Sequence, residues 1–156
     1  MSLLAIHVGL SIIGIASGLI VLYGLLTGVA LGGWTALFLA TTILTSITGF
    51  PLAPFGFDPP RAIGVLSLIL LAIAVGAYYL FHLAGLWRWV YVVTAMTALY
   101  LNCFVLVFQG FLKVQPLHDL APTQSEPPFL VAQGAVLILF VMLGFLAVRK
   151  FHPRAA

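Results

Sequence analysis

Polar side chains interrupt the long apolar runs of this sequence, and the most reactive of them is His7. His7 and Ser11 stand four residues apart, which places both on one face of a helix. An ionisable group inside a membrane helix is a functional candidate by default, because hydrocarbon offers it no partner. His7 could ligate haem iron or hydrogen-bond a quinone. The alternative is a neutral ring bonded to Thr48 or Gln109.

Other polar residues are expected at a similar depth, in the outer half of the membrane. Polar groups in hydrocarbon either face another helix or line a pathway, so we expect this set to surround a cavity between helices. The candidate cavity residues are His7, Ser11, Thr45, Thr48, Asn102, Gln109 and Gln133. The alternative is structural: hydroxyls bond the carbonyl four residues earlier, and amides hold neighbouring helices together.

One polar loop, residues 113–126, carries two of the three acidic residues and one of the four histidines. We expect it outside the cell, above the polar half of the bundle, so His118, Asp119 and Glu126 are candidate lid residues. Thr123 and Glu126 also have the spacing of a capping box at the start of the last helix. The alternative for His118 and Asp119 is a solvated loop dipeptide.

The histidines form no recognised metal or haem motif. His7 and His82 are expected near opposite membrane surfaces, about 20 Å apart at 1.5 Å per helical residue, too far for two axial ligands of one haem. His7 and His118 are the weak candidates for a metal site, with a carboxylate from Asp58 or the polar loop. Imidazole and carboxylate together suit a hard or borderline metal.

No catalytic residues are expected. The sequence contains no glycine-rich phosphate loop, nucleophile elbow or Glu-x-x-His pattern. A single cysteine, Cys103, excludes an intramolecular disulfide and a cysteine-based zinc site. We therefore expect a protein that is not an enzyme.

The composition indicates a protein whose solvent is the bilayer. Hydrophobic residues make up 63% of the chain and charged residues 6%, and the mean hydropathy is +1.25. Soluble domains carry about 25% charged residues, so this chain could not cover a water-exposed surface. Six Lys and Arg without a basic patch exclude nucleic acid as a partner.

We predict an all-α integral membrane bundle, one domain over residues 1–156, with about five transmembrane helices. The expected helices cover about 3–28, 33–50, 61–84, 88–112 and 127–150, each near the roughly 20 residues that a span requires. The outer loops are 51–60 and 113–126. The first apolar run is too long for the core of a signal peptide and has no basic residue before it, so it is expected to remain as a helix.

The basic residues predict the orientation of the five spans. With the N-terminus outside and the C-terminus in the cytoplasm, only Arg61 and Lys113 are outside, as the positive-inside rule requires. The residues then expected at the inner side are Arg88, Arg149, Lys150 and Arg154, together with Trp34, Trp87 and Trp89.

Gly14 and Gly18 form a Gly-x-x-x-Gly pattern on the His7 face of the first helix. Two glycines at this spacing permit close backbone approach to another helix. The neighbour is either a helix of the same bundle or a second copy of the chain, so a homo-oligomer through Gly14 and Gly18 is one expected assembly. Membership of a larger membrane complex is the other.

Three segments resemble a family of uncharacterised small polytopic inner-membrane proteins of bacteria. They are Ile6-His7 with Ser11–Gly18, Gly33–Thr42, and Ala121–Phe129. The resemblance covers most of the chain and implies a multi-pass protein of the bacterial inner membrane. The family brings no known activity, cofactor or partner with it.

The leading functional expectation is an accessory subunit or a small-ligand-binding helical bundle with a polar cavity in its outer half. Its partners are the lipid bilayer and a homo-oligomer or larger complex. One alternative is a redox protein that binds haem or quinone near His7. A second is a small-solute transporter, although the sequence offers no charged residue at mid-membrane to couple ions.

Overall fold

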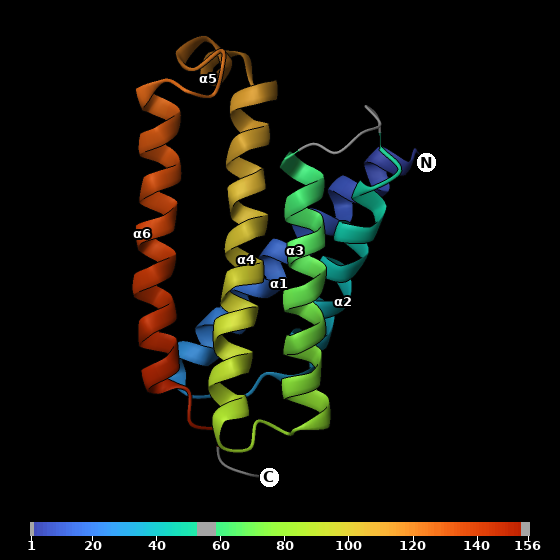
Figure 1. The fold of residues 1–156 in the computed structure, drawn as a ribbon, viewed down its shortest axis with the longest axis vertical. Helices are drawn as coiled ribbons and strands as arrows, with labels where there is room; N and C mark the ends of the chain where they lie inside the picture. The colour runs from blue at the N-terminus through green and yellow to red at the C-terminus, as the bar shows by residue number, and fades with distance from the viewer. Residues whose placement is uncertain (1, 53–58, 154–156) are drawn as a thin grey trace.

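The computed structural model describes residues 2–52 and 59–153, and within them it is helical, 84% helix with no strand. The long helices lie side by side in a bundle, with the two termini at opposite ends (Figure 1). The elements along the chain are α1 (Leu3–Thr27), α2 (Gly32–Gly49), α3 (Pro59–Val75), the π-helix η1 (Gly76–Leu80), α4 (Leu86–Lys113), α5 (Gln115–Leu120) and α6 (Pro127–Lys150).

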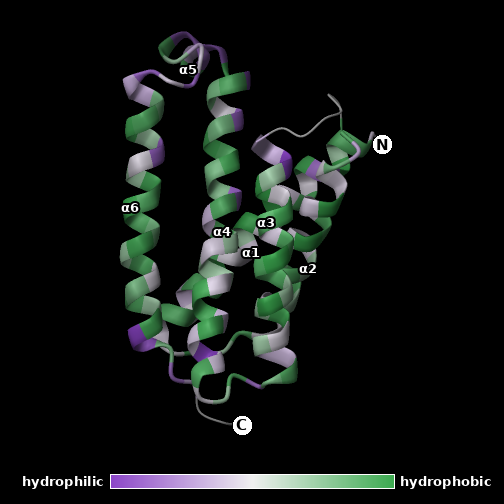
Figure 2. Ribbon diagram, in the orientation of Figure 1, coloured by the Kyte–Doolittle hydropathy of each residue, from purple (hydrophilic) through white to green (hydrophobic). Residues whose placement is uncertain are grey.

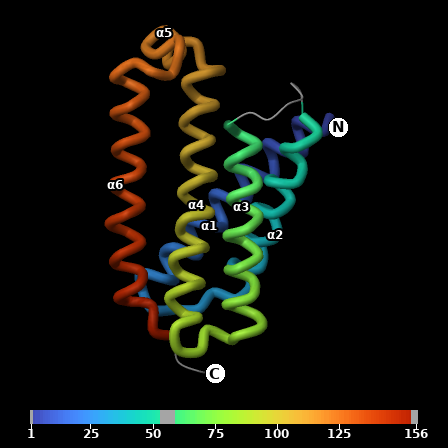
Figure 3. The backbone as a smooth tube through the Cα atoms, in the orientation of Figure 1, coloured from blue at the N-terminus to red at the C-terminus, as the bar shows by residue number. Residues whose placement is uncertain are grey.

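The long helices alternate in direction along the chain. We call the end that carries the N-terminus and α5 the upper end, and the end that carries the C-terminus the lower end. Helix α1 descends from the upper end, α2 returns, and α3, α4 and α6 continue the alternation (Figure 3). Helix α1 is inclined to the others: it starts beside α2, crosses α4 and ends beside α6. The upper parts of α1 and α6 therefore lie on different sides of the bundle.

Among the described residues, four helical segments are long and apolar enough to cross a membrane: α1, α3 with η1, α4 and α6. Hydrophilic residues gather at the two ends of the bundle and on α5, whereas the helix shafts are mostly apolar (Figure 2). Helix α6 exposes the most apolar surface, with only 11% of its most apolar stretch buried. Such a surface suits hydrocarbon, and the prediction of an all-α bundle with helices able to span a membrane is confirmed to this extent.

The span expected over 61–84 consists of two elements. The α-helix stops at Val75 and the chain widens into the π-helix Gly76–Leu80. His82 and Leu83 then have φ of 47° and 59°, in the left-handed region that residues with a side chain seldom adopt. These two residues end the helix and turn the chain toward α4, because no continuing helix can include them.

Arg88 fixes the lower end of α6 to α4. Its guanidinium donates to the carbonyl of Val148 at 3.2 Å and to the carbonyl of Phe151. These carbonyls lie at a helix C-terminus, where no further turn supplies donors, so a cation there also opposes the negative end of the helix dipole. Phe151 is buried against Tyr91, and the residue after α6 is thereby packed against α4.

The start of α6 departs from the expected capping box. Thr123 is not the N-cap; the N-cap is Glu126 itself, and Pro127 and Pro128 occupy the first helical positions. The Glu126 carboxylate instead accepts from the Thr123 backbone N–H at 3.2 Å and the Thr123 hydroxyl at 2.8 Å. One half of the capping box is thus present, the bond from the Thr123 N–H to the Glu126 carboxylate, but the Thr123 hydroxyl donates to Glu126 and caps no helix N–H.

Gly14 and Gly18 permit close packing within the chain. A Cβ atom at Gly14 would lie 3.1 Å from the Thr42 hydroxyl, and one at Gly18 would lie 2.5 Å from Leu99 and 2.9 Å from Phe38. Helix α1 thus uses this face to contact α2 and α4 of its own bundle. Of the two neighbours expected for this face, the structure shows helices of the same bundle.

Replacing Gly18 with leucine should destabilise the bundle by about 1–3 kcal/mol, because overpacking forces Leu99 and Phe38 to move. Gly9 on the same helix is the matched control, since a Cβ there would have no described atom within 4 Å. Unfolding of both variants in mixed micelles measures the difference. Equal unfolding free energies for Gly18→Leu and Gly9→Leu would contradict this account of the α1 packing.

Candidate polar site in the upper half of the bundle

His7 joins α1 to α2 through a hydrogen bond with Thr48. Its Nδ1 atom lies 3.0 Å from the Thr48 hydroxyl oxygen. That hydroxyl donates its own hydrogen to the Leu44 carbonyl at 2.7 Å, so it accepts from His7. The geometry therefore assigns the proton of a neutral His7 to Nδ1, so Nε2 is the acceptor nitrogen of the ring.

The close approach at this point depends on Gly49. A Cβ there would lie 3.3 Å from the His7 ring, so a glycine leaves room for the imidazole beside α2. Ser11 belongs to the same region, but its hydroxyl donates to the His7 carbonyl at 2.9 Å. Of the two polar groups on this face of α1, only the His7 ring reaches another helix through a hydrogen bond described in the structure.

Most hydroxyls of the bundle bond the backbone of their own helix. Thr41 donates to Leu37 at 2.7 Å and Ser46 donates to Thr42 at 3.0 Å. Ser17, Thr48 and Thr94 make the same contact with the carbonyl four residues earlier. For these residues the bond to their own helix explains the burial, because a bonded hydroxyl can be buried without a ligand.

Asn102 forms a second polar contact, deeper in the bundle. Its Nδ2 atom lies 3.4 Å from the Thr42 hydroxyl, which joins α4 to α2 where Gly14 admits the backbone of α1. Thr42 is fully buried, yet it was not among the residues selected from the sequence. Helical spacing alone could not decide whether Thr41 or Thr42 faces the neighbouring helices. The inward face of α2 is wide enough to bury both.

Two buried oxygens near this region have no partner among the described residues: Thr45 Oγ1 and Gln109 Oε1. A buried polar atom without a hydrogen bond costs about 1–3 kcal/mol, so each one needs an explanation. The backbone of Thr45 is a hydrogen-bonding neighbour of the His7 ring. Lys113, one helical turn after Gln109 on α4, is close enough to His7 to act on it electrostatically. These atoms and His7 Nε2 therefore lie in the same upper part of the bundle.

Gln133 is not part of this group. Its Nε2 atom donates to the Phe104 carbonyl at 3.0 Å and joins α6 to α4. Its amide oxygen is buried and has no partner among the described residues. Helix α1 contacts α6 only where α1 nears its lower end, so Gln133 and His7 lie in separate parts of the bundle.

The two hollows recorded in the structure are lined mainly by apolar side chains. One, of about 150 Å³, lies between α3, α4 and α6. The other, of about 430 Å³, lies between α4 and α6. Neither is lined by the polar residues that were expected to surround a cavity. The region around His7 is a set of contacts between helices, with two buried oxygens that have no partner among the described residues.

The polar loop lies over α4 and α6 instead of above His7. Helix α5 and the following residues pack on the upper ends of these helices through a small cluster of Phe111, Ala121 and Phe129. In Figure 1 the start of α1 lies on the far side of the same end. His118, Asp119 and Glu126 therefore do not form a lid for the polar site, because the inclination of α1 carries its upper half away from α6.

The side chains of the polar loop bond to one another. Gln115 donates to the Asp119 carboxylate at 2.8 Å. Desolvation acts to raise the pKa of Glu126, but hydrogen bonds from Thr123 and Ser125 outweigh it and hold the pKa of this carboxyl below its ordinary value. Glu126 is thus a charged loop-ordering group at neutral pH.

The metal candidates do not come together. Within residues 2–52 and 59–153, no three His, Cys, Asp or Glu side chains are grouped so that they could hold an ion. His7 lies on α1, whereas His118 lies on α5, which packs on α4 and α6. Asp58, the carboxylate considered with them, lies outside the described residues.

A third polar contact between helices, at the lower end, was not predicted from the sequence. The hydroxyl oxygens of Thr35 and Tyr91 are 3.4 Å apart, and both side chains are almost fully buried. The ring of Tyr78, on the π-helix, lies 5.1 Å from that of Tyr91. The only signal in the sequence was the run of interfacial residue types, which does not indicate that Tyr91 points inward.

Thr45→Val and Thr41→Val form a matched pair for the unpartnered hydroxyl. Both residues are buried on α2, but the Thr41 hydroxyl has a bond and that of Thr45 has none among the described residues. In ligand-free purified protein, Thr45→Val should raise the free energy of unfolding by about 1 kcal/mol, and Thr41→Val should not raise it. Destabilisation by Thr45→Val would show that its hydroxyl has a partner within the fold.

No protein-family model matches the chain, and comparison with curated proteins and with solved structures gives no significant match. A functional proposal for this protein therefore depends on its own geometry.

Proposed function

We propose that this chain is a multi-pass protein of the bacterial inner membrane that binds a small hydrogen-bonding ligand at its upper half. The binding atoms are His7 Nε2, the Thr45 hydroxyl and the Gln109 amide oxygen. It acts without catalysing a reaction, as a ligand-binding bundle or an accessory subunit of a larger membrane complex. The single observation that carries the proposal is that Nδ1 of His7 bonds Thr48, while the same upper part of the bundle holds two buried oxygens that have no partner among the described residues.

The proposal includes α2 as a fifth span, although α2 is not among the four most apolar helices. Its polarity is reversed relative to a helix in water. The hydroxyls of Thr35, Thr41, Thr42, Thr45 and Ser46 are buried, whereas its exposed positions are Gly32, Gly33, Trp34, Ala36, Leu37, Ala40, Leu44 and Ile47. A helix with apolar residues outside and hydroxyls inside suits hydrocarbon, and its position between α1 and α3 supports a full crossing.

The proposed orientation has the upper end outside and the lower end in the cytoplasm. Arg88, Arg149 and Lys150 lie at the lower end, and the two described acids, Asp119 and Glu126, lie at the upper end. Arg61 and Lys113 are the basic residues of the upper end. This distribution supports a cytoplasmic C-terminus by the positive-inside rule.

The ligand class follows from the binding atoms. A neutral His7 with its proton on Nδ1 presents an acceptor at Nε2, and the Gln109 oxygen is also an acceptor. Such a set favours a ligand with hydroxyl or N–H donors, for example an alcohol or an amide, over one that carries only acceptors. A quinone offers carbonyl acceptors and is therefore the weaker match, while its reduced quinol carries the hydroxyls that would bind.

Haem ligation is the second candidate and has an observation of its own. A histidine that ligates a metal usually donates its other ring N–H to a fixed acceptor, and Thr48 fills this position for His7. Iron would then be held at Nε2 with His7 as the axial ligand from the protein. A haem would have to lie against the apolar upper part of α1, where Leu3, Leu4 and Val8 are exposed.

The ligand proposal is tested by the small molecules that co-purify from native membranes. Wild-type protein and Thr41→Val should retain a compound that His7→Leu and Thr45→Val lose at least tenfold, since those two variants remove binding atoms. Haemin titration with Soret detection, and ubiquinol as a second probe, separate the redox candidates. Retention of the same compounds by all four proteins would contradict a site at His7.

The topology is tested separately with reporters. A periplasm-active enzyme fused after Ala156 should be inactive, and one inserted after Gln124 in the polar loop should be active, because the lower end of α6 and the polar loop are at opposite ends of the bundle. A reporter in the turn after Gly28 decides whether α2 crosses. Activity of the fusion after Ala156 would reverse the orientation, and no change of side between Gly28 and residues 53–58 would remove the fifth span.

A further inference from the structure

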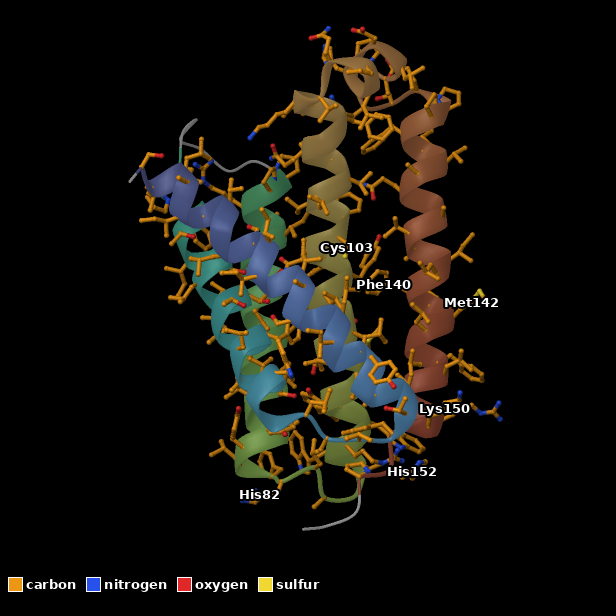
Figure 4. The ribbon with its side chains drawn as sticks, turned by 180° about the vertical axis from the view of Figure 1, so that it is seen from behind. His82, Cys103, Phe140, Met142, Lys150 and His152 are labelled. Carbon is orange, nitrogen blue, oxygen red and sulfur yellow. The ribbon has the colours of Figure 1, made fainter. Side chains whose placement is uncertain are left out.

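A second site is suggested by the apolar groove between α4 and α6, in the lower half of the bundle. The groove has a volume of about 430 Å³. The residues that line it are Val93, Met96, Thr97 and Tyr100 from α4, and Leu137, Phe140, Val141, Gly144, Phe145 and Val148 from α6. Phe140 lies between the two helices, whereas Met142 points away from them (Figure 4).

The length of the groove corresponds to one leaflet. Leu137 and Val148 are eleven residues apart, or about 16 Å along α6 at 1.5 Å per residue. This is roughly half of the 30 Å hydrocarbon core of a bilayer. The groove begins at the lower end of the bundle and stops near its middle, so it has the length of a single acyl chain.

The mouth of the groove is basic. The Arg149 guanidinium lies over the ring of Phe145, 4.9 Å from its centroid, and Phe145 lines the groove. Lys150 follows at the end of α6, and Lys150 and His152 lie together at this lower end (Figure 4). The described acids, Asp119 and Glu126, are both at the other end. The mouth thus carries positive charge with no described carboxylate to neutralise it.

We propose that this groove binds one anionic phospholipid, with an acyl chain along α4 and α6 and the phosphate at Arg149 and Lys150. Guanidinium and ammonium groups beside a groove of acyl-chain length recognise both parts of such a molecule. Arg88 remains with the carbonyls of Val148 and Phe151 and acts as a structural residue. The proposal is independent of the ligand at His7, which lies at the other end of the bundle.

Gly144 provides a variant that fills the groove without disturbing the fold. A Cβ at Gly144 would have no described atom within 4 Å, and the same holds for Gly134 on the same helix, which does not line the groove. Gly144→Phe should therefore block the acyl chain, and Gly134→Phe is its matched control. The contribution of the basic mouth is tested with the double variant Arg149→Ala, Lys150→Ala. Its control is Lys113→Ala, which removes a basic residue at the upper end.

The test is native mass spectrometry of the full chain, purified in mild detergent and supplied with phosphatidylglycerol or phosphatidylcholine of equal acyl chains. Wild type, Gly134→Phe and Lys113→Ala should retain one phosphatidylglycerol in preference to phosphatidylcholine. Gly144→Phe should lose both lipids. Arg149→Ala with Lys150→Ala should bind phosphatidylglycerol about 30-fold more weakly, the loss expected for two basic residues at a membrane surface, and so lose the preference.

Circular dichroism and thermal unfolding establish that each variant is folded before its lipids are counted. Equal retention of the two lipids by wild type, or unchanged retention in Gly144→Phe, would overturn the proposal. A lipid-free dimer that Gly144→Phe dissociates would also overturn it, because a second copy of the chain would then be the occupant of the groove.

Discussion

A hydroxyl buried among membrane-spanning helices has no water to bond, and α2 satisfies this constraint at most of its hydroxyls, Thr45 being the exception among the described residues. Its hydroxyls point into the bundle and its apolar residues point outward. Thr41 and Ser46 bond their own helix, so α1 and α4 can pack against them without supplying partners. Gly14 and Gly18 remove the side chains that would hold α1 away. Helix α2 thereby packs between α1 and α3, whereas α4 contacts α1, α3, α5 and α6.

The two ends of the bundle are held together differently. At the lower end, Arg88 binds the last carbonyls of α6, and the buried Tyr91 packs with Phe151. At the upper end, α1 and α6 diverge, and the described buried oxygens without partners, from Thr45, Gln109 and Gln133, are found there. Regions with fewer internal contacts open and bind more readily, so the ligand site is proposed where packing is less complete.

The sequence predicted the class of the protein because the solvent selects composition. Sixty-three per cent hydrophobic residues and few charges require hydrocarbon around the chain, and proline and glycine positions indicated where helices end. It did not predict the π-helix at Gly76–Leu80 or the left-handed backbone of His82 and Leu83. Those features depend on how the end of α3 packs, which no periodic pattern encodes.

The sequence by itself determined that His7 shares a face with Ser11, Gly14 and Gly18, because helical spacing fixes which residues lie on one face. Only the tertiary structure decided that the Thr48 hydroxyl accepts a hydrogen bond from His7 and that the polar loop lies over α4 and α6. The physical reason is the inclination of α1, which sets which helix each of its turns meets. Crossing angles arise from the fit of side chains across helices, and they cannot be read from one helix alone.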